Sequence, residues 1–238
     1  MRRTMSTLAA VVMTAGVLAV PAMAQDAPAE ELTGCPDGAP AAGFDDVAVD
    51  STHAEAIDCA TSRDVIRGVT EYSFAPAASA TRGQLTAMIA RALRAADIDV
   101  PGATTPPFAD AVGTTHAMDI ASMEAAGVIQ GFEDGTFRPG LSVTRAQVAS
   151  IATRAHAFAL GLPTEATGGP WFDDYTQGTH ADNVDVAFEL GLVQGRTSDT
   201  FDPASDVRRD QFASIVNRLL GAMDAFPEAD LTLTVLQS

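Results

Sequence analysis

The stretch GFEDGTFRPGLSVTRAQVASIATR, residues 131–154, combines turn-forming residues with residues that favour the start of a helix. Asp134 and Gly135 are typical turn residues, and the proline that follows them prevents a strand or helix from continuing. Thr144 is a favoured N-cap, and Gln147 stands at the N3 spacing of a capping box. Apolar residues then recur at helical spacing, so the stretch predicts a turn and then an amphipathic helix.

The same pattern occurs twice more, which identifies an internal repeat. The upstream copy contains Gly68, Phe74, Pro76, Thr81, Arg82 and Gln84, and the downstream copy contains Gly195, Phe201, Pro203, Arg208, Arg209 and Gln211. Each copy begins with a Phe-x-Asp triplet that recurs every 64 residues and ends in Asp46, Asp110 or Asp174. A histidine follows at His53, His116 and His180. We expect the three repeats to span 44–95, 108–160 and 171–222.

The first helix of each repeat is expected directly after the histidine. Apolar residues at helical spacing predict it at 54–63, 117–126 and 181–190. Gly127 and Gly191 stand where a left-handed residue would end the helix. The first repeat has Asp64 there, which tolerates that conformation less well.

The second helix of each repeat has one apolar face. It is expected to start after Thr81 and Thr144, but the third repeat has Arg208 in place of the threonine. That helix is therefore expected to start weakly, or earlier, at Asp206. With two helices in each repeat and little sheet, the sequence predicts an all-α fold.

The N-terminus has the features of an export signal. Arg2 and Arg3 form a basic head, residues 8–20 form an apolar run too short to span a bilayer comfortably, and small residues at 22–24 form a cleavage site. We therefore expect a signal peptide at 1–24 that uses the ordinary secretion route. A lipid-attachment cysteine is not expected, because acidic residues separate Cys35 from the apolar run.

The rest of the chain is strongly acidic. An acidic linker rich in proline and alanine is expected at 25–43, and a C-terminal tail at 223–238. Removing Arg2 and Arg3 from the 14 basic residues leaves 12 arginines and no lysine against 31 acidic residues. Nucleic acid is therefore not an expected partner, because its binding depends on a basic surface. No later segment is long and apolar enough to predict a transmembrane helix.

The chain has two cysteines, Cys35 and Cys59. In an exported protein such a pair forms a disulfide more readily than a metal site or a nucleophile. We expect a bond that ties the linker to the first repeat.

These motifs together resemble the S-layer homology repeat, of which three copies usually make one unit. The resemblance covers about residues 44–220, and the cysteine pair is similar to that of exported actinobacterial members. It implies a pseudo-threefold helical bundle with grooves between neighbouring repeats. The grooves of this family bind a secondary cell wall polysaccharide, often one with a pyruvylated terminal sugar, and hold the protein at the cell surface without catalysis or a cofactor. A surface-layer protein is a further candidate partner.

The resemblance also implies the binding residues. They are the motif arginines Arg82, Arg145 and Arg209, the aspartates Asp46, Asp110 and Asp174, the turn glycine Gly135 and the motif position of Gln147. The second repeat alone keeps the aspartate, the Asp-Gly-Thr turn and the Thr-Arg pair. We therefore expect Arg145, supported by Asp110 and Gly135, to form the best groove.

Two departures from the family pattern bear on binding. The tryptophan that usually follows the histidine is alanine in all three repeats, at Ala54, Ala117 and Ala181, which removes a stacking surface. The motif glutamate is Gln84, Gln147 and Gln211, which removes a negative charge beside each arginine and suits an anionic ligand.

Each feature also has a structural interpretation. The Thr-x-x-Gln pairs are capping boxes whatever else they do, and the arginines could form internal ion pairs. The histidines could be metal ligands or could make structural hydrogen bonds, and the acidic pairs at 45–46 and 173–174 could be glycosidase carboxylates or calcium ligands. Two alternatives to polysaccharide binding stay open: a structural protein that keeps the fold without binding sugar, and a secreted hydrolase, for which no catalytic set is evident.

Overall fold

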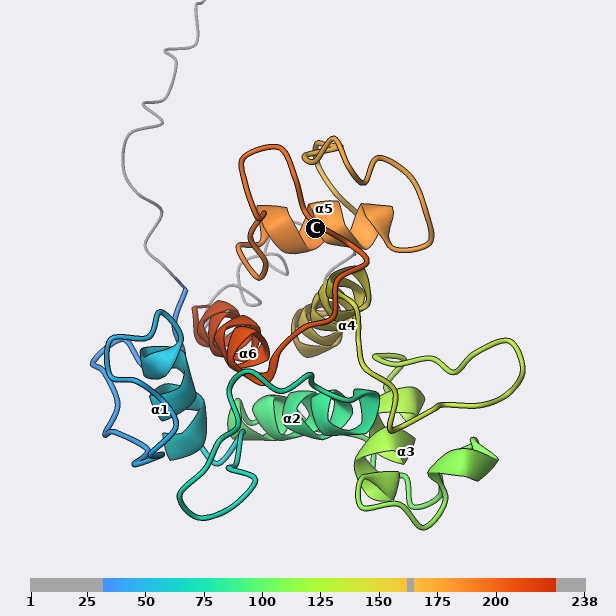
Figure 1. Cartoon of the computed structure of the whole chain (residues 1–238). Coiled ribbons are helices and arrows are strands. Elements are labelled where there is room, and N and C mark those ends of the chain that lie inside the picture. The colour runs from blue at the N-terminus through green and yellow to red at the C-terminus, as the bar shows by residue number, and fades with distance from the viewer. Residues whose placement is uncertain (1–31, 162–164, 226–238) are drawn as a thin grey trace, which may run out of the picture. The chain divides into compact units, whose positions relative to one another are not determined.

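The computed structural model describes residues 32–161 and 165–225 (Figure 1). This part of the chain has six α-helices, a single 3₁₀ turn and only isolated β-bridges, which confirms the all-α prediction. The helices are α1 (Ala54–Ser62), α2 (Arg82–Ala95), η1 (Ala109–Ala111), α3 (Ala117–Ala125), α4 (Arg145–Leu160), α5 (Ala181–Glu189) and α6 (Arg209–Asp224). The expected signal peptide and most of the expected tail lie outside the described residues. No helix in the described ranges is long and apolar enough to cross a membrane.

Each first helix is followed by a left-handed residue at the position that the sequence indicated. Gly127 follows α3 with φ 71°, and the N–H of Val128 donates to the carbonyl of Met123 at 2.9 Å, which is the long bond of a Schellman motif. Asp64 adopts the same conformation after α1, with φ 56°, and Val65 makes the equivalent bond to Ala60. Each of the three helices stops one residue before its predicted end.

The second helices begin in register. The Thr81–Gln84 and Thr144–Gln147 capping boxes are both formed. In the third repeat the side chain of Asp210 accepts from the N–H of Gln211 at 2.7 Å and so replaces the missing threonine oxygen. Helix α6 therefore starts at Arg209, and the expectation of an earlier start at Asp206 is wrong.

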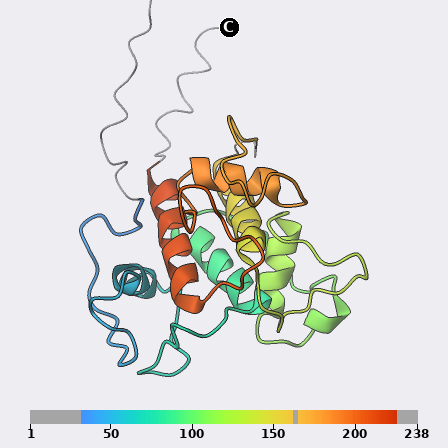
Figure 2. The same cartoon turned by 45° about the horizontal axis from the view of Figure 1, so that its top comes forward.

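Helices α2, α4 and α6 contact one another, and the first helices pack around them. Each first helix packs on the second helix of a different repeat: α3 on α2, α5 on α4, and α1 on α6. Figures 1 and 2 both show α1 beside α6. The third repeat thus returns to the first, and the repeats interlock in a cycle. That a threefold axis relates them stays a prediction.

A pair of phenylalanines with their rings in contact lies at the centre of each repeat's loop. In the second repeat the rings of Phe108 and Phe137 lie 5.4 Å apart. A Cβ added to Gly131 would lie 2.3 Å from the Phe108 ring, so this position requires glycine. The equivalent ring pairs are Phe44–Phe74 and Phe172–Phe201, beside Gly68 and Gly195.

The disulfide between Cys35 and Cys59 is present, which confirms the predicted bond. It joins the segment around Cys35 to α1, and the N–H of the neighbouring Gly34 donates to Oδ1 of Asn217 on α6 at 3.0 Å. Arg63, just after α1, donates to the carbonyl of Gly34 at 2.9 Å and pairs with Asp224 at the end of α6. The N-terminal segment therefore fastens the first repeat to the third.

Candidate functional site

The motif arginines join each repeat to the next. Arg82 is the first residue of α2, and its guanidinium donates to the carbonyl oxygens of Phe137 at 2.8 Å and Gln130 at 2.9 Å. Its Cζ also lies 4.5 Å from the centre of the Phe137 ring, within range of a cation–π interaction. Both carbonyls belong to the loop of the second repeat, so a first-repeat arginine holds a second-repeat loop.

The other two arginines repeat this geometry. Arg145 donates to the carbonyls of Phe201 and Gln194, each at 2.7 Å. Arg209 donates to the carbonyls of Phe74 at 2.8 Å and Arg67 at 3.0 Å. The cycle of arginine contacts therefore runs from the first repeat to the second, from the second to the third, and from the third back to the first.

The backbone at the start of each second helix makes the same connection. The N–H groups of Arg82 and Gly83 donate to the carbonyls of Leu141 and Pro139, each at 2.9 Å. These donors have no partner inside the helix, so the next repeat satisfies them. Arg145 and Ala146, and Arg209 and Asp210, make the equivalent bonds. The proline loop of one repeat thus caps the helix of the preceding one.

The arginines are held in place but keep donors for a ligand. Arg82 and Arg209 are 7% and 4% exposed, and burial lowers the pKa of all three arginines. A guanidinium has five N–H donors and stays protonated in proteins. Because two of them bind loop carbonyls, the remaining donors form a rigid, positively charged group.

The Phe-x-Asp aspartates fix the loops that the arginines bind. Oδ1 and Oδ2 of Asp110 accept from the N–H groups of Phe137 at 2.9 Å and Arg138 at 2.7 Å. The bond from Phe137, partly offset by burial and aided by Arg138, lowers the pKa of Asp110. The residue after the loop phenylalanine has a left-handed backbone in each repeat: φ is 56° at Ala75, 57° at Arg138 and 63° at Asp202. Asp46 and Asp174 hold the equivalent loops in the first and third repeats.

A cavity of about 530 Å³, here called groove A, lies beside the loop of the second repeat. Its lining includes Arg82 from α2, Phe132 and Asp134 from the second-repeat loop, Gln147 and Arg154 from α4, and His180 before α5. Groove A therefore collects residues from all three repeats. It contains two of the predicted site residues, Arg82 and Gln147.

A second cavity of about 320 Å³, here called groove B, is built from equivalent positions. Arg209, Gly68, Gln84, Met88, Arg91 and His116 replace Arg82, Gly131, Gln147, Ile151, Arg154 and His180 of groove A. Because equivalent repeat positions line both cavities, groove A and groove B are two copies of one feature of the repeat.

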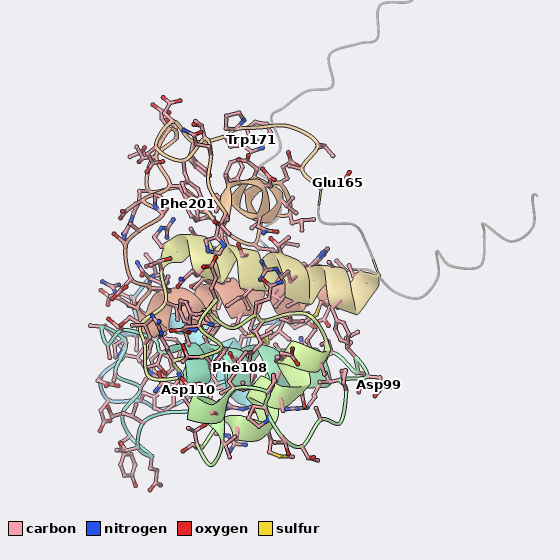
Figure 3. The ribbon with its side chains drawn as sticks, turned by 90° about the vertical axis from the view of Figure 1, so that its right-hand side faces the viewer. Asp99, Phe108, Asp110, Glu165, Trp171 and Phe201 are labelled. Atoms are coloured by element: carbon pink, nitrogen blue, oxygen red, sulfur yellow. A yellow bond between two sulfur atoms is a disulfide. The ribbon has the colours of Figure 1, made fainter. Side chains whose placement is uncertain are left out.

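Arg145 does not line groove A or groove B. Its acceptor Phe201 lies beside α5, whereas Asp110 lies beside α3, and α4 passes between them in Figure 3. The structure thus does not bring Arg145 together with Asp110 and Gly135. The expectation had assumed contacts within one repeat, but each arginine contacts the loop of the next. Gly135, with φ 78°, forms the turn beside groove A without lining it.

Asp134 is held in this turn by its neighbours. Hydrogen bonds from Thr136 and an ion pair with Arg138 at 2.7 Å lower the pKa of Asp134 to about 2. The ring of Phe132 lies 4.8 Å from the Cζ of Arg82 and 4.2 Å from that of Arg138. Phe132 therefore gives groove A an aromatic surface. The tryptophan that is usual in the family is alanine in this chain and supplies no such surface to either groove.

A second arginine in each repeat was not among the binding residues predicted from the sequence. Arg154 lines groove A and Arg91 lines groove B, and burial lowers the pKa of both. Together with Arg218 they recur in the same register as the motif arginines. This recurrence was the signal that could have found them.

Two of the three repeat histidines make the predicted structural hydrogen bond. Nδ1 of His180 lies 2.8 Å from Oγ of Ser150, and Nδ1 of His53 lies 2.8 Å from Oγ of Ser214. The described residues contain no group of three or more side chains arranged to hold a metal ion.

Comparison with known proteins identifies a family. Segments 43–86, 107–149 and 172–213, more than half of the chain, match the S-layer homology domain. The chain is 32% identical over 195 residues to Exoglucanase XynX of Acetivibrio thermocellus, covering 79% of this chain and 17% of that protein. It is 27% identical over 184 residues to an S-layer protein of Bacillus thuringiensis subsp. finitimus, covering 76% of this chain and 22% of that protein. The chain thus spans less than a quarter of the length of these relatives.

Proposed function

Since the chain belongs to the S-layer homology domain family, we propose that it binds a cell wall polysaccharide non-covalently and is thereby held at the cell surface. The relative named S-layer protein supports this location. We further propose that residues 1–24 direct export, and that a pyruvylated sugar of the polysaccharide and a surface-layer protein are partners.

The observation that carries the proposal is the match between grooves A and B. Each presents one arginine fixed by two loop carbonyls, a second arginine and a motif glutamine. Fixed donors bind sugar hydroxyls and carboxylates well, because little side-chain freedom is lost on binding. We propose Arg82, Arg209 and Gln147 as ligand contacts, with Asp46 and Asp110 acting through the loops that they hold.

Binding has to depend on local contacts. The chain has a formal net charge of −17, so it does not attract an anionic polymer over long distances. At physiological salt, charges more than about 8 Å apart are largely screened in any case. The arginines of the grooves therefore supply the attraction.

We propose no catalytic activity for this chain. Groove A contains a hydrogen-bonded serine and histidine, Ser150 and His180, but among the described residues no carboxylate bonds the other ring nitrogen of His180, and the grooves' histidines serve as N-cap residues of first helices. Exoglucanase XynX is named for an activity, but this chain spans only 17% of its length. We attribute that likeness to a shared anchoring segment.

A structural role without sugar binding is the second candidate. It is favoured by the arginines themselves, because their contacts to loop carbonyls already account for their recurrence. Arg145, Asp174 and Asp202, which belong to no matched cavity, fit that role.

Sedimentation with purified cell walls separates the two candidates. The processed protein is mixed with intact walls and with walls stripped of their secondary polysaccharide. We expect it to pellet with intact walls only. Equal sedimentation with both preparations, or with neither, would reject polysaccharide binding and favour the structural role.

A further inference from the structure

Groove B differs from groove A in charge. The lining of groove A contains Glu133 and Asp134 beside its arginines. The lining of groove B contains Arg67, Arg91 and Arg209 and, in the described part of the chain, no carboxylate, although Arg67 is paired at 2.9 Å with Asp64, which lies outside the lining. Groove B therefore offers a more favourable environment to an anion.

The two grooves also differ in the bonding of their histidines. In groove A, Nδ1 of His180 is bonded to Ser150, as His53 is to Ser214. The first repeat has Ala87 in the position of these serines, so His116 lacks that partner. In the described residues His116 makes no side-chain hydrogen bond, although it lines groove B. Its ring nitrogens are therefore available to a ligand.

The charged groups around His116 are mostly positive. They are Arg91 and Arg94 of α2, Arg67 of the first-repeat loop with its partner Asp64, Arg209 of α6, and Asp119 of its own helix. Asp119 is already paired with Arg94 at 2.8 Å. Burial, and then Arg91, lower the pKa of His116, while Asp119 raises it. Without a ligand the imidazole is therefore neutral at neutral pH.

We propose that His116 takes up a proton when groove B binds the carboxylate of an acidic sugar residue. The inference rests on the proposed function and concerns the regulation of one of its grooves. The carboxylate would lie between Arg91, Arg209 and His116, and the imidazolium N–H would donate a charge-assisted hydrogen bond to it. The protein would then bind the polysaccharide more tightly in an acidic medium.

The direction of the pH effect follows from linkage. A bound anion favours the protonated imidazole, so the pKa of His116 is higher in the complex than in the free protein. Affinity therefore increases as the pH falls from 8 through about 6.5, and it becomes constant below the pKa of the free protein. Each unit by which the anion raises that pKa makes the binding about tenfold tighter.

Calorimetric titration of the whole processed chain tests the proposal. The probe is a methyl glycoside with a 4,6-linked pyruvate ketal, and its methyl ester is the uncharged control. We expect binding about tenfold tighter at pH 5.5 than at pH 8, with net proton uptake in buffers of different ionisation enthalpy. The ester should show neither effect.

Two variants assign the effect to His116. His116→Gln removes the titrating group, and Ala87→Ser supplies the serine that the other repeats carry at this position. Both should lose most of the pH dependence, whereas His53→Gln, outside both grooves, should keep it. Binding of the parent that is independent of pH, or pH dependence that survives in both variants, would overturn this inference alone. Absence of binding at both pH values would overturn the proposed function with it.

Discussion

Arg209, the first residue of α6, donates a hydrogen bond from Nε to the carbonyl oxygen of Phe74 at 2.8 Å, across 135 residues of sequence. The bond connects the third repeat with the first, as does the packing of α1 on α6, and together they close the cycle of repeats. The motif arginine therefore has a structural role in this chain, whether or not it also contacts a ligand.

Replacement of Arg209 by alanine should destabilise the protein. The change leaves the carbonyls of Phe74 and Arg67 without a donor and removes a guanidinium that lies 4.6 Å from the Phe74 ring. We expect a loss of about 3 kcal/mol in the free energy of unfolding, measured by urea denaturation. Lysine should recover only part, because it lacks the planar fork. Arg196→Ala, which removes only an exposed ion pair, is the control and should change stability by less than about 0.5 kcal/mol.

Gly131→Ala should also destabilise the protein, through a clash of its Cβ with the Phe108 ring. The ring already packs on Phe137, so it cannot move away without loss of packing. We expect a loss of about 2 kcal/mol, as for other overpacked sites. Gly102→Ala is the matched control, because an added Cβ there meets no atom within 4 Å. Equal stability of the two variants would show that the loop is not closely packed.

The free energy of unfolding should fall as the medium becomes acidic. Burial lowers the pKa of His53, His116, His156 and His180, so the unfolded chain binds protons first as the pH falls below about 6.5. The histidine contribution is thus fully present above that pH and is lost as the pH falls through the folded pKa values. Hydrogen bonds that lower the pKa of Asp110 add a second loss below about pH 4.

Urea midpoints at pH 8 and pH 5.5, in high salt to screen the net charge of −17, check this sign. We expect the lower midpoint at pH 5.5. His156→Leu should reduce the difference, because the other repeats carry Leu93 and Leu220 at this position. A higher midpoint at pH 5.5 would contradict the prediction.

Local sequence patterns predicted the helices well, and the reason is visible in their ends. Gly127, Thr144 and Gln147 act through bonds to residues a few positions away, so their spacing alone predicts the cap or stop. Repeat spacing likewise predicted the number of helices. Asp64 takes the left-handed conformation that glycine takes in the other repeats. Its position in the repeat therefore predicted its backbone conformation better than the conformational preference of aspartate did.

The contacts between repeats could not be predicted in this way. Nothing in the sequence near Arg145 indicates that its guanidinium binds the loop at Gln194, about 50 residues later, and not the loop of its own repeat. The grouping of Arg145 with Asp110 failed for that reason. Arg154 is a different case, because its recurrence with Arg91 and Arg218 was present in the sequence.

Arg154 allows a direct test, because it lines groove A without holding a loop. In the described ranges no protein group accepts a hydrogen bond from its side chain, whereas Arg82 beside it has two acceptors. Its removal should therefore change binding without changing the fold. Arg91 is its counterpart in groove B, where its side chain also donates to the carbonyl of Val65 at 2.8 Å.

The most direct measurement is the affinity of Arg154→Gln and of Arg91→Gln/Arg154→Gln for intact cell walls, with the unfolding free energy of each variant determined in parallel. We predict that Arg154→Gln binds about tenfold more weakly and the double variant still more weakly, as for loss of charge-assisted contacts. Arg154→Gln should keep the parent's stability, and Arg196→Gln should match the parent in both measurements. Wall binding that is unchanged in the double variant would contradict polysaccharide binding through these grooves.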